Sequence, residues 1–375
     1  MLPFQAGAAA FLMASLTAAN AFATDEAPQR AVDQSRKLIE SRLAAGHPGF
    51  SVAVARHGEL LWSEGFGVAD LESGTPVTTE TLFRIGSTSK AFTGAAAGRL
   101  FARGLIDFDA DVRSLYPDFP EKEHVVRLRH LFTHQAGIRH YRGLESFNRK
   151  HYDSVADGLA IFASEPLEFR PGSKTSYSSY GFNLAGAALA HVAELSFAEL
   201  LASEITEPLG LTATQVDDPT RPAPGIATFY SKRSKGMTPA VTVDDSYKAP
   251  SGGLLSTPTD VATFGAELLR AHAGQSLWLS AEVVRKLFTP LPLDDGEPTI
   301  YALGFRSQLA DPKAEPPRRF VVHHGGSSIG ARSMLLMYPD EGLVVALQCN
   351  SDAYDTKEKD ASEIAGYFRD ALADE

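Results

Sequence analysis

Apolar and polar positions near the start of the chain follow first a helical and then a strand period. Residues 28–45 repeat apolar side chains at helical spacing, and Gly46 ends the pattern. Residues 50–62 show a period close to two, interrupted by a His57-Gly58 turn. We therefore predict a helix followed by a β-hairpin.

The end of the chain repeats these elements in a different order. Residues 332–338 and 343–349 are apolar strand segments joined by a turn at 339–342, and apolar side chains four apart over 364–372 predict a closing helix. The middle, about 105–250, is richer in helical patterns and loops. We expect an α/β fold, in which one antiparallel sheet built from both chain ends is flanked by helices and holds a mainly helical insertion.

The first two dozen residues have another pattern. Residues 6–19 are uncharged and mostly Ala, Leu, Phe and Met, and a small-x-small motif ends at Ala23 before a polar stretch. This is typical of a signal peptide cleaved after Ala23, so we expect a periplasmic or secreted protein. A retained membrane anchor is the alternative, although the run is short for a bilayer span. The expected divisions are a signal peptide at 1–23, a sheet subdomain from 24–104 and 251–375, and a helical subdomain at 105–250.

Composition narrows the possible partners. The chain has 375 residues, 44% of them apolar, with 46 acidic against 35 basic side chains and a net charge of −11. This acidic balance argues against nucleic acid or an anionic membrane as a partner, and we expect no stable membrane insertion after signal cleavage. Cys349 is the only cysteine, which excludes an internal disulfide and a cysteine-based zinc site.

An S-x-x-K pattern at residues 87–90 supplies the candidate nucleophile. It opens a run of small, apolar residues at 91–97, so Ser87 would start a helix with Lys90 one turn later on the same face. A serine hydroxyl needs a base, and a lysine is a base only when burial or the helix N-terminus lowers its pKa. The alternative is a helix-capping serine followed by a surface lysine.

Two further segments extend this pattern. Residues 171–179 place Tyr177 and Ser179 before a helical run, and residues 323–330 read His-His-Gly-Gly-Ser-Ser-Ile-Gly. With the S-x-x-K pattern they resemble the three motifs of the penicillin-recognising serine hydrolases, S-x-x-K, Y-x-N and K-T-G or H-x-G. This family includes class C β-lactamases, D-Ala-D-Ala carboxypeptidases, esterases and peptidases.

The resemblance extends over nearly all of the mature chain. Residues 131–138 and 252–260 resemble the family's L-L-T-H-x-S-G-L and G-G-L-x-S-T-x-x-D segments. Residues 117–123, 137–141 and 243–248 are similar to the branch of the mitochondrial β-lactamase-like serine protease and its bacterial relatives.

The resemblance implies a role for each catalytic position. Ser87 would be the nucleophile that accepts the acyl group, and Lys90 and Tyr177 would share the proton transfers. Tyr177 would need a lowered pKa to act as a phenolate, which a neighbouring ammonium would supply. The backbone N–H groups of Ser87 and Ser327 would form the oxyanion hole.

Four positions are assigned to substrate binding. Gly325 and Gly326 would let the substrate approach their strand without a side chain in the way. Ser179 replaces the asparagine of Y-x-N and would contact the substrate or simply cap a helix. His324 replaces the lysine of K-T-G and would hold a substrate carboxylate only when protonated, below roughly pH 6.5.

A second serine motif and a histidine cluster suggest competing sites. Residues 326–330 fit the G-x-S-x-G nucleophile elbow around Ser328, but that fold needs a later histidine and none follows His324. His130 and His134 have the spacing of a zinc-binding helix, without the glutamate that zinc peptidases use. The resemblance assigns this segment to packing near the site, so we expect no metal and no cofactor.

Together these patterns predict an exported serine hydrolase that forms an acyl-enzyme on Ser87. By its nearest branch we expect a serine-type peptidase acting on peptide or amide bonds, with a peptide or small acyl compound as its substrate. The alternatives are a β-lactamase or D-Ala-D-Ala carboxypeptidase, a small-ester hydrolase, and a catalytically silent binding or sensor protein of the same fold. Substrate identity and oligomeric state stay open, since specificity lies in pocket shape.

Overall fold

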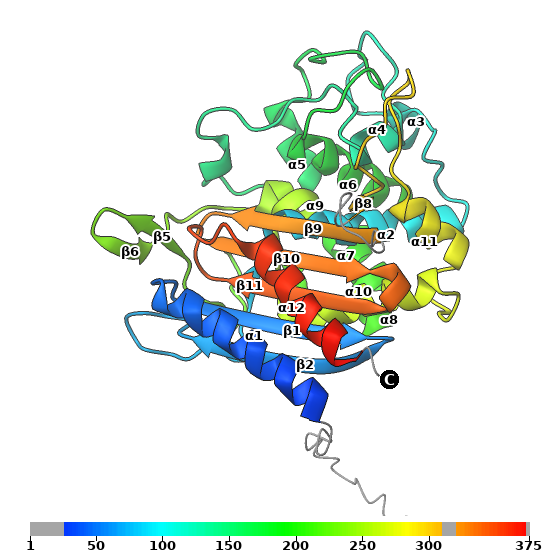
Figure 1. Cartoon of the computed structure of the whole chain (residues 1–375). Helices are drawn as coiled ribbons and strands as arrows, with labels where there is room; N and C mark the ends of the chain where they lie inside the picture. Colours follow the sequence, from blue (N-terminus) through cyan, green and yellow to red (C-terminus); the bar gives the residue numbers. More distant parts are fainter. Residues whose placement is uncertain (1–25, 310–319, 373–375) are drawn as a thin grey trace, which may run out of the picture.

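A six-stranded antiparallel sheet forms the centre of the molecule (Figure 1). The computed structural model describes residues 26–309 and 320–372, so the expected signal segment lies outside the described residues. The sheet has the order β2-β1-β11-β10-β9-β8. Its strands are β1 (Gly49–Arg56), β2 (Glu59–Gly67), β8 (Arg306–Leu309), β9 (Phe320–Ser328), β10 (Ala331–Tyr338) and β11 (Leu343–Cys349).

The strands that pair at the centre come from opposite ends of the chain. β1 pairs with β11 from Phe50 opposite Cys349 to Arg56 opposite Leu343, which joins the N-terminal hairpin to the C-terminal one. The predicted hairpins, the first helix and the closing helix are all confirmed. Cys349 is buried at the end of β11 as a free thiol.

Helices cover both faces of the sheet. α1 (Glu26–Ala44) and α12 (Lys357–Ala371) lie on the face towards the viewer in Figure 1, whereas α2 (Ser89–Ala102) and α10 (Pro258–His272) lie behind it. Because side chains alternate along a strand, Val52 and Val54 of β1 pack with α1 and α12, and Ala53 packs with α2 and α10. The predicted α/β fold is therefore confirmed.

The chain between α2 and α10 is a mainly helical region. It contains α3 (Val112–Leu115), α4 (Leu128–Phe132), α5 (Val155–Gly158), α6 (Ser179–Ala193), α7 (Phe197–Leu201), α8 (Glu207–Leu209), α9 (Ala249–Gly252), and the hairpin of β5 (Tyr230–Arg233) and β6 (Gly236–Pro239). Of these, α3, α4, α5 and α6 lie above the sheet in Figure 1, whereas α7 and α8 lie behind it. A small sheet joins β3 (Phe83–Arg84), β7 (Leu254–Ser256) and β4 (Gln215–Val216), and α11 (Ala281–Phe288) follows α10.

No single helix in the described ranges combines the length and the apolar character that a bilayer crossing requires. Only Ser179–Ala193 and Phe197–Leu209 taken together meet both criteria, and these two segments are bent by 81°.

One edge of β9 is left open beside the helical region. β8 pairs with β9 only as far as His323, whereas β10 accompanies β9 to Ser328. The backbone of residues 324–328 therefore has no strand partner on its outer side within the described part of the chain. The start of α2 lies at this edge, which brings the S-x-x-K segment to the third motif.

Candidate active site

Ser87 stands in a tight turn that leads into α2. The turn is the short 3₁₀ segment Gly86–Thr88, and Ser87 is partly exposed. Lys90, one turn later, is fully buried, and its Nζ lies 3.3 Å from Ser87 Oγ. The alternative of a surface lysine is therefore wrong.

Lys90 has the surroundings of an uncharged base. Its Nζ also lies 3.1 Å from Ser179 Oγ and 2.6 Å from the Ser251 carbonyl oxygen, but no carboxylate pairs with it among the described residues. Burial, and then the positive charges of Lys248 and Arg306, hold the pKa of Lys90 well below its usual value. A neutral amine beside a serine hydroxyl can accept its proton.

Tyr177 shares hydrogen bonds with the same serines. Its hydroxyl interacts with Ser87 and Ser179, and Lys90 Nζ lies 5.0 Å from its ring centroid. Burial raises the pKa of Tyr177 more than these hydrogen bonds and the Arg306 charge lower it. The expected phenolate is therefore wrong in direction: the pKa of Tyr177 lies above its ordinary value, so Tyr177 keeps its proton at neutral pH.

Two histidines hold the tyrosine segment in place. His134 Nδ1 accepts the backbone N–H of Ser178 at 3.1 Å, and His140 Nδ1 accepts that of Ser179 at 3.2 Å. The His134 ring lies 4.2 Å from the Tyr177 ring, centroid to centroid. Burial lowers the pKa of both histidines, that of His140 to about 4, so both are neutral acceptors at neutral pH.

The helix cap at α6 belongs to Ser178. Its Oγ accepts the N–H of Gly181 at 3.0 Å and donates to the Arg139 carbonyl oxygen at 2.7 Å. Ser179 is thus free of the capping role considered for it, and its side chain instead turns to Lys90 and Tyr177 in the cavity.

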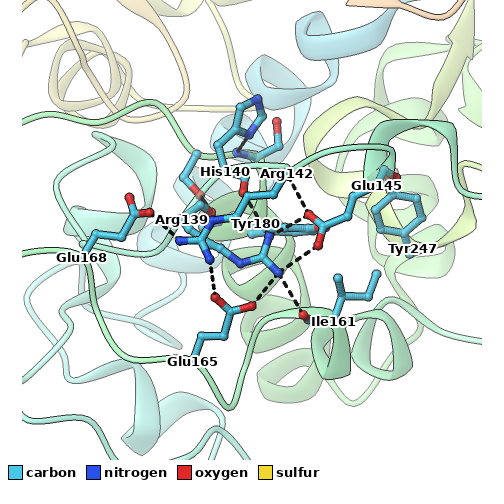
Figure 2. A network of polar contacts seen from close by, with 12 residues as sticks. Arg139, His140, Arg142, Glu145, Ile161, Glu165, Glu168, Tyr180 and Tyr247 are labelled. Carbon is cyan, nitrogen blue, oxygen red and sulfur yellow. Dashed lines mark hydrogen bonds and ion pairs between the residues drawn. The ribbon is translucent and has the colours of Figure 1, made fainter.

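An ion-pair network holds the chain around His140 against the start of α6 (Figure 2). The buried Arg139 guanidinium makes two contacts with Glu145, at 2.7 and 3.0 Å, and one with Glu165 at 2.7 Å. Tyr180 of α6 donates its hydroxyl to Glu145 Oε2 at 2.9 Å. The network fixes residues 139–145, which include His140, against the first turn of α6.

The nucleophile turn presses directly on the backbone of β9. Gly86 has a φ of +49°, and a Cβ there would lie 2.7–2.8 Å from the Ser327 backbone. The backbone segments that carry Ser87 and Ser327 therefore lie side by side, as is required of two amides that form one oxyanion hole. A Cβ on Gly326 would lie 1.9 Å from the Ile85 carbonyl oxygen.

The two predicted substrate glycines thus have different surroundings. Gly325 lines the cavity beside Ser87, as expected of a position that a substrate approaches. Gly326 does not, because it packs beneath the nucleophile turn. The expectation that Gly326 makes room for the substrate is therefore wrong. The absence of a side chain at Gly326 instead lets the nucleophile turn pack against β9.

His324 is also placed differently from the expectation. It is buried, its Nδ1 lies 3.0 Å from the Gly325 carbonyl oxygen, and it is absent from the cavity lining. Burial, with Lys90 and Arg306 nearby, holds the pKa of His324 well below its usual value. A protonated His324 binding a carboxylate is therefore wrong, because side chains alternate along β9 and His323 is the histidine that reaches the cavity.

The cavity in front of Ser87 has a volume of about 640 Å³ and a largely cationic wall. Sequence reasoning missed its four cationic side chains. Lys248 lies in a segment that carried the family resemblance, whereas Arg306 follows no motif. The lining side chains with chemistry are Ser87, His140, Tyr141, Tyr177, Ser179, Lys248, Arg306, His323, Arg332, Asp352, Lys357 and Glu358. A larger cavity of about 870 Å³ beside α5 and α6 contains none of the predicted site residues.

The competing sites lack the local structure that they need. α4 ends at Phe132 and His134 has a φ of +59°, so His130 and His134 do not share a helix face. Within residues 26–309 and 320–372, no three His, Cys, Asp or Glu side chains are grouped to hold a metal ion. β9 turns at Ser328 into another strand, not into the helix of a nucleophile elbow.

A serine hydroxyl beside a buried lysine of lowered pKa, on a turn packed against an antiparallel sheet, is the arrangement of a serine hydrolase. Comparison with known families gives the same class: residues 35–367 match the family model described as Beta-lactamase, and the chain belongs to this family. The expected relationship to the penicillin-recognising serine hydrolases is confirmed, and the protein is an enzyme of the serine hydrolase class.

Similar proteins have several different names. The "Serine beta-lactamase-like protein LACTB, mitochondrial" of Bos taurus is 26% identical over 425 residues, which cover 86% of this chain and 76% of the relative. The "D-aminopeptidase" of Gluconobacter oxydans is 29% identical over 309 residues, covering 81% and 56%. The solved octameric penicillin-binding protein homologue from Pyrococcus abyssi superposes with a TM-score of 0.76 at 24% identity, covering 92% and 78%, which shows the shared fold.

Proposed function

We propose that the protein hydrolyses a peptide or amide bond through an acyl-enzyme on Ser87. The observation that carries the proposal is the 3.3 Å contact between Ser87 Oγ and the Nζ of the fully buried Lys90, whose pKa burial lowers. Lys90 takes the hydroxyl proton while Oγ attacks the substrate carbonyl carbon, and the N–H groups of Ser87 and Ser327 bind the oxyanion.

Tyr177 completes the first half of the reaction as an acid. Its raised pKa keeps it protonated, so it can give a proton to the leaving amine and recover one from protonated Lys90. Water then attacks the acyl-enzyme, and the same groups return the proton to Ser87. The name of the Gluconobacter oxydans relative, D-aminopeptidase, supports an amide substrate.

Arg306 favours a second candidate, the β-lactamase or D-Ala-D-Ala carboxypeptidase. Both kinds of substrate carry a carboxylate, which the buried His324 cannot bind. Arg306 lines the cavity, its Nε is buried without a hydrogen-bond partner, and no ion pair to it occurs among the described residues. A guanidinium of this kind is suited to binding a carboxylate.

A substrate panel tests the proposal. Purified protein would be assayed on acylated peptides, a D-Ala-D-Ala peptide, a chromogenic cephalosporin and nitrophenyl esters, each beside Ser87→Ala. We expect turnover of a peptide or amide that Ser87→Ala abolishes. Turnover restricted to esters would move the function to the small-ester alternative, and no Ser87-dependent turnover would favour the silent protein.

The proposal also includes export, with residues 1–23 as the signal. Fractionation of expressing cells and the N-terminal sequence of the purified protein test this part. A mature chain beginning at Thr24 outside the cytoplasm is expected, and an uncleaved chain held in a membrane would contradict it.

A further inference from the structure

Lys248 brings a second buried ammonium group to the cavity of Ser87. It ends the short 3₁₀ segment Ser246–Lys248, its side chain is only 7% exposed, and it lines the same cavity as Ser87 and Ser179. None of the three sequence motifs includes it.

Asp245 fixes the charge and the position of this lysine. Its carboxylate oxygen lies 2.8 Å from Lys248 Nζ, and Asp245 is 1% exposed. Burial disfavours the charge of Lys248, but the Asp245 carboxylate more than offsets this and raises the pKa of Lys248. The rings of Tyr141 and Tyr247 lie 6.0 and 5.8 Å from Nζ and flank it. The ammonium is therefore charged and held in one place.

Most of the hydrogen-bonding capacity of this ammonium is unused. It has three N–H donors, and Asp245 is its one acidic contact in the part of the chain that the structure describes. No hydrogen bond from Nζ to any other described acceptor occurs. A nine-tenths buried ammonium with open donors at a catalytic cavity is suited to an oxygen acceptor on a ligand, because leaving such donors unpaired is costly.

The surroundings indicate which part of a substrate would meet Lys248. Tyr177 interacts with Ser87 and Ser179 and, under the proposed function, protonates the leaving group, which therefore extends past Tyr177. Tyr141 also interacts with Ser179, and with Ser251, and Lys248 Nζ lies 6.0 Å from the Tyr141 ring centroid. Among the described residues no hydrogen bond or cation–ring contact joins Lys248 to Tyr177, because its ring contacts are with Tyr141 and Tyr247. This separation from the group that protonates the leaving group places Lys248 beside the acyl part of the substrate.

We propose that Lys248 binds a carbonyl oxygen on the acyl part of the substrate and is a specificity-determining residue of this enzyme. The proposal rests on the proposed acyl-enzyme at Ser87 and names the acyl group that the site prefers. This group is an acyl chain with a second carbonyl a few bonds before the scissile one, as in a peptide.

Two esters isolate this contact. Nitrophenyl 4-oxopentanoate and nitrophenyl pentanoate have the same chain length and leaving group and differ only in one carbonyl oxygen. We expect the wild-type protein to prefer the 4-oxo ester by about tenfold or more in kcat/KM, since a hydrogen bond to a charged group has this size. The double variant Lys248→Met with Asp245→Asn, which leaves no lone buried carboxylate, is expected to bring this ratio close to that of the uncatalysed reaction.

Control variants distinguish specific binding from general damage. Lys235→Met changes an exposed lysine in the β5–β6 turn and is expected to keep the wild-type ratio. Lys248→Arg, which retains a donor, is expected to keep part of the preference.

Three results would contradict the proposal or its premise. A wild-type protein without preference for the 4-oxo ester overturns the proposal, even where the double variant does not fold. In the double variant, the acidic limb of the pH profile could shift equally for both esters while the ratio of their kcat/KM values stays unchanged. That result would mean that Lys248 only tunes the pKa of Lys90, and it also overturns the proposal. Hydrolysis that survives Ser87→Ala contradicts the proposed function instead.

Discussion

At the scale of single residues, the site depends on burial changing the ordinary charge of its groups. Lys90 is fully buried, pairs with no acidic side chain within the described ranges and has a pKa well below its usual value, and Tyr177 keeps its proton at neutral pH. The acid and the base are therefore assigned by their environments and not by their residue types.

The first prediction concerns Lys90. A base works only when unprotonated, so kcat/KM should rise as pH increases through the lowered pKa of Lys90, well below the ordinary range of a lysine. Lys90→Met is expected to lower kcat by about 10²–10⁴-fold and to remove this acidic limb. A pH–rate profile on a neutral ester checks it, and an unaltered limb in the variant would contradict the role of Lys90.

The second prediction concerns Tyr177. If its proton goes to the leaving group, Tyr177→Phe should slow amide hydrolysis by about 10²–10⁴-fold. Nitrophenyl esters should lose much less, because nitrophenolate leaves without a proton. Parallel kcat values for an amide and an ester give the comparison, and equal losses on both would argue against Tyr177 as the acid.

At the scale of elements, the contact between the nucleophile turn and β9 sets the geometry. Thr88 Oγ1 lies 2.8 Å from Ser333 Oγ of β10, and Ser333 Oγ donates to the Ile85 carbonyl oxygen at 2.6 Å. Thr88 Oγ1 also lies 3.1 Å from the His324 carbonyl oxygen of β9. These bonds tie the start of α2 to two strands of the sheet, so small side chains there are structural requirements.

The third prediction tests that contact. In Gly326→Ala the new Cβ would lie 1.9 Å from the Ile85 carbonyl oxygen, so the variant should lose about 1–3 kcal/mol of unfolding free energy, as in other overpacked sites. Activity should also fall as the Ser87 turn moves. Gly366→Ala in α12, where a Cβ meets nothing within 4 Å, is the control and should be neutral or slightly stabilising. Urea unfolding measures both, and equal stability of the two variants would contradict the account.

The sequence was informative wherever a period or a motif was local. Both hairpins and the first and last helices follow from spacing, whereas the roles of Ser87 and Tyr177 follow from the resemblance of their segments to the motifs of a known family. It could not separate His323 from His324, because which strand face meets the cavity depends on pairing register. The directions of the pKa shifts, the Ser178 cap and the cavity positions of Lys248 and Arg306 depend on burial, which only the assembled fold defines.

At the scale of the whole molecule, the two chain ends hold the enzyme together. Arg42 of α1 makes two contacts with Asp360 of α12, at 2.7 and 2.8 Å, and Tyr354 donates to the same carboxylate at 2.7 Å. Asp360 is fully buried. This ion pair joins the first helix to the last one beside the central sheet.

The fourth prediction follows from this ion pair. Burial alone would raise the pKa of Asp360, but the hydrogen bonds from Arg42 and Tyr354 lower it overall. Its stabilisation is therefore complete above the ordinary carboxyl pKa and is lost as pH falls through the lowered one. Asp360→Asn should cost about 3 kcal/mol at pH 7 and flatten the acid side of the stability curve. Denaturant unfolding against pH checks this, and parallel wild-type and variant curves would contradict it.

The central claim is that Ser87 is the nucleophile, activated by Lys90. Its most direct test is labelling with a serine-directed fluorophosphonate, followed by mass mapping of the modified peptide. We predict one adduct on Ser87, absent in Ser87→Ala and much slower to form in Lys90→Met. An adduct on another serine, or labelling that persists in Ser87→Ala, would contradict the account.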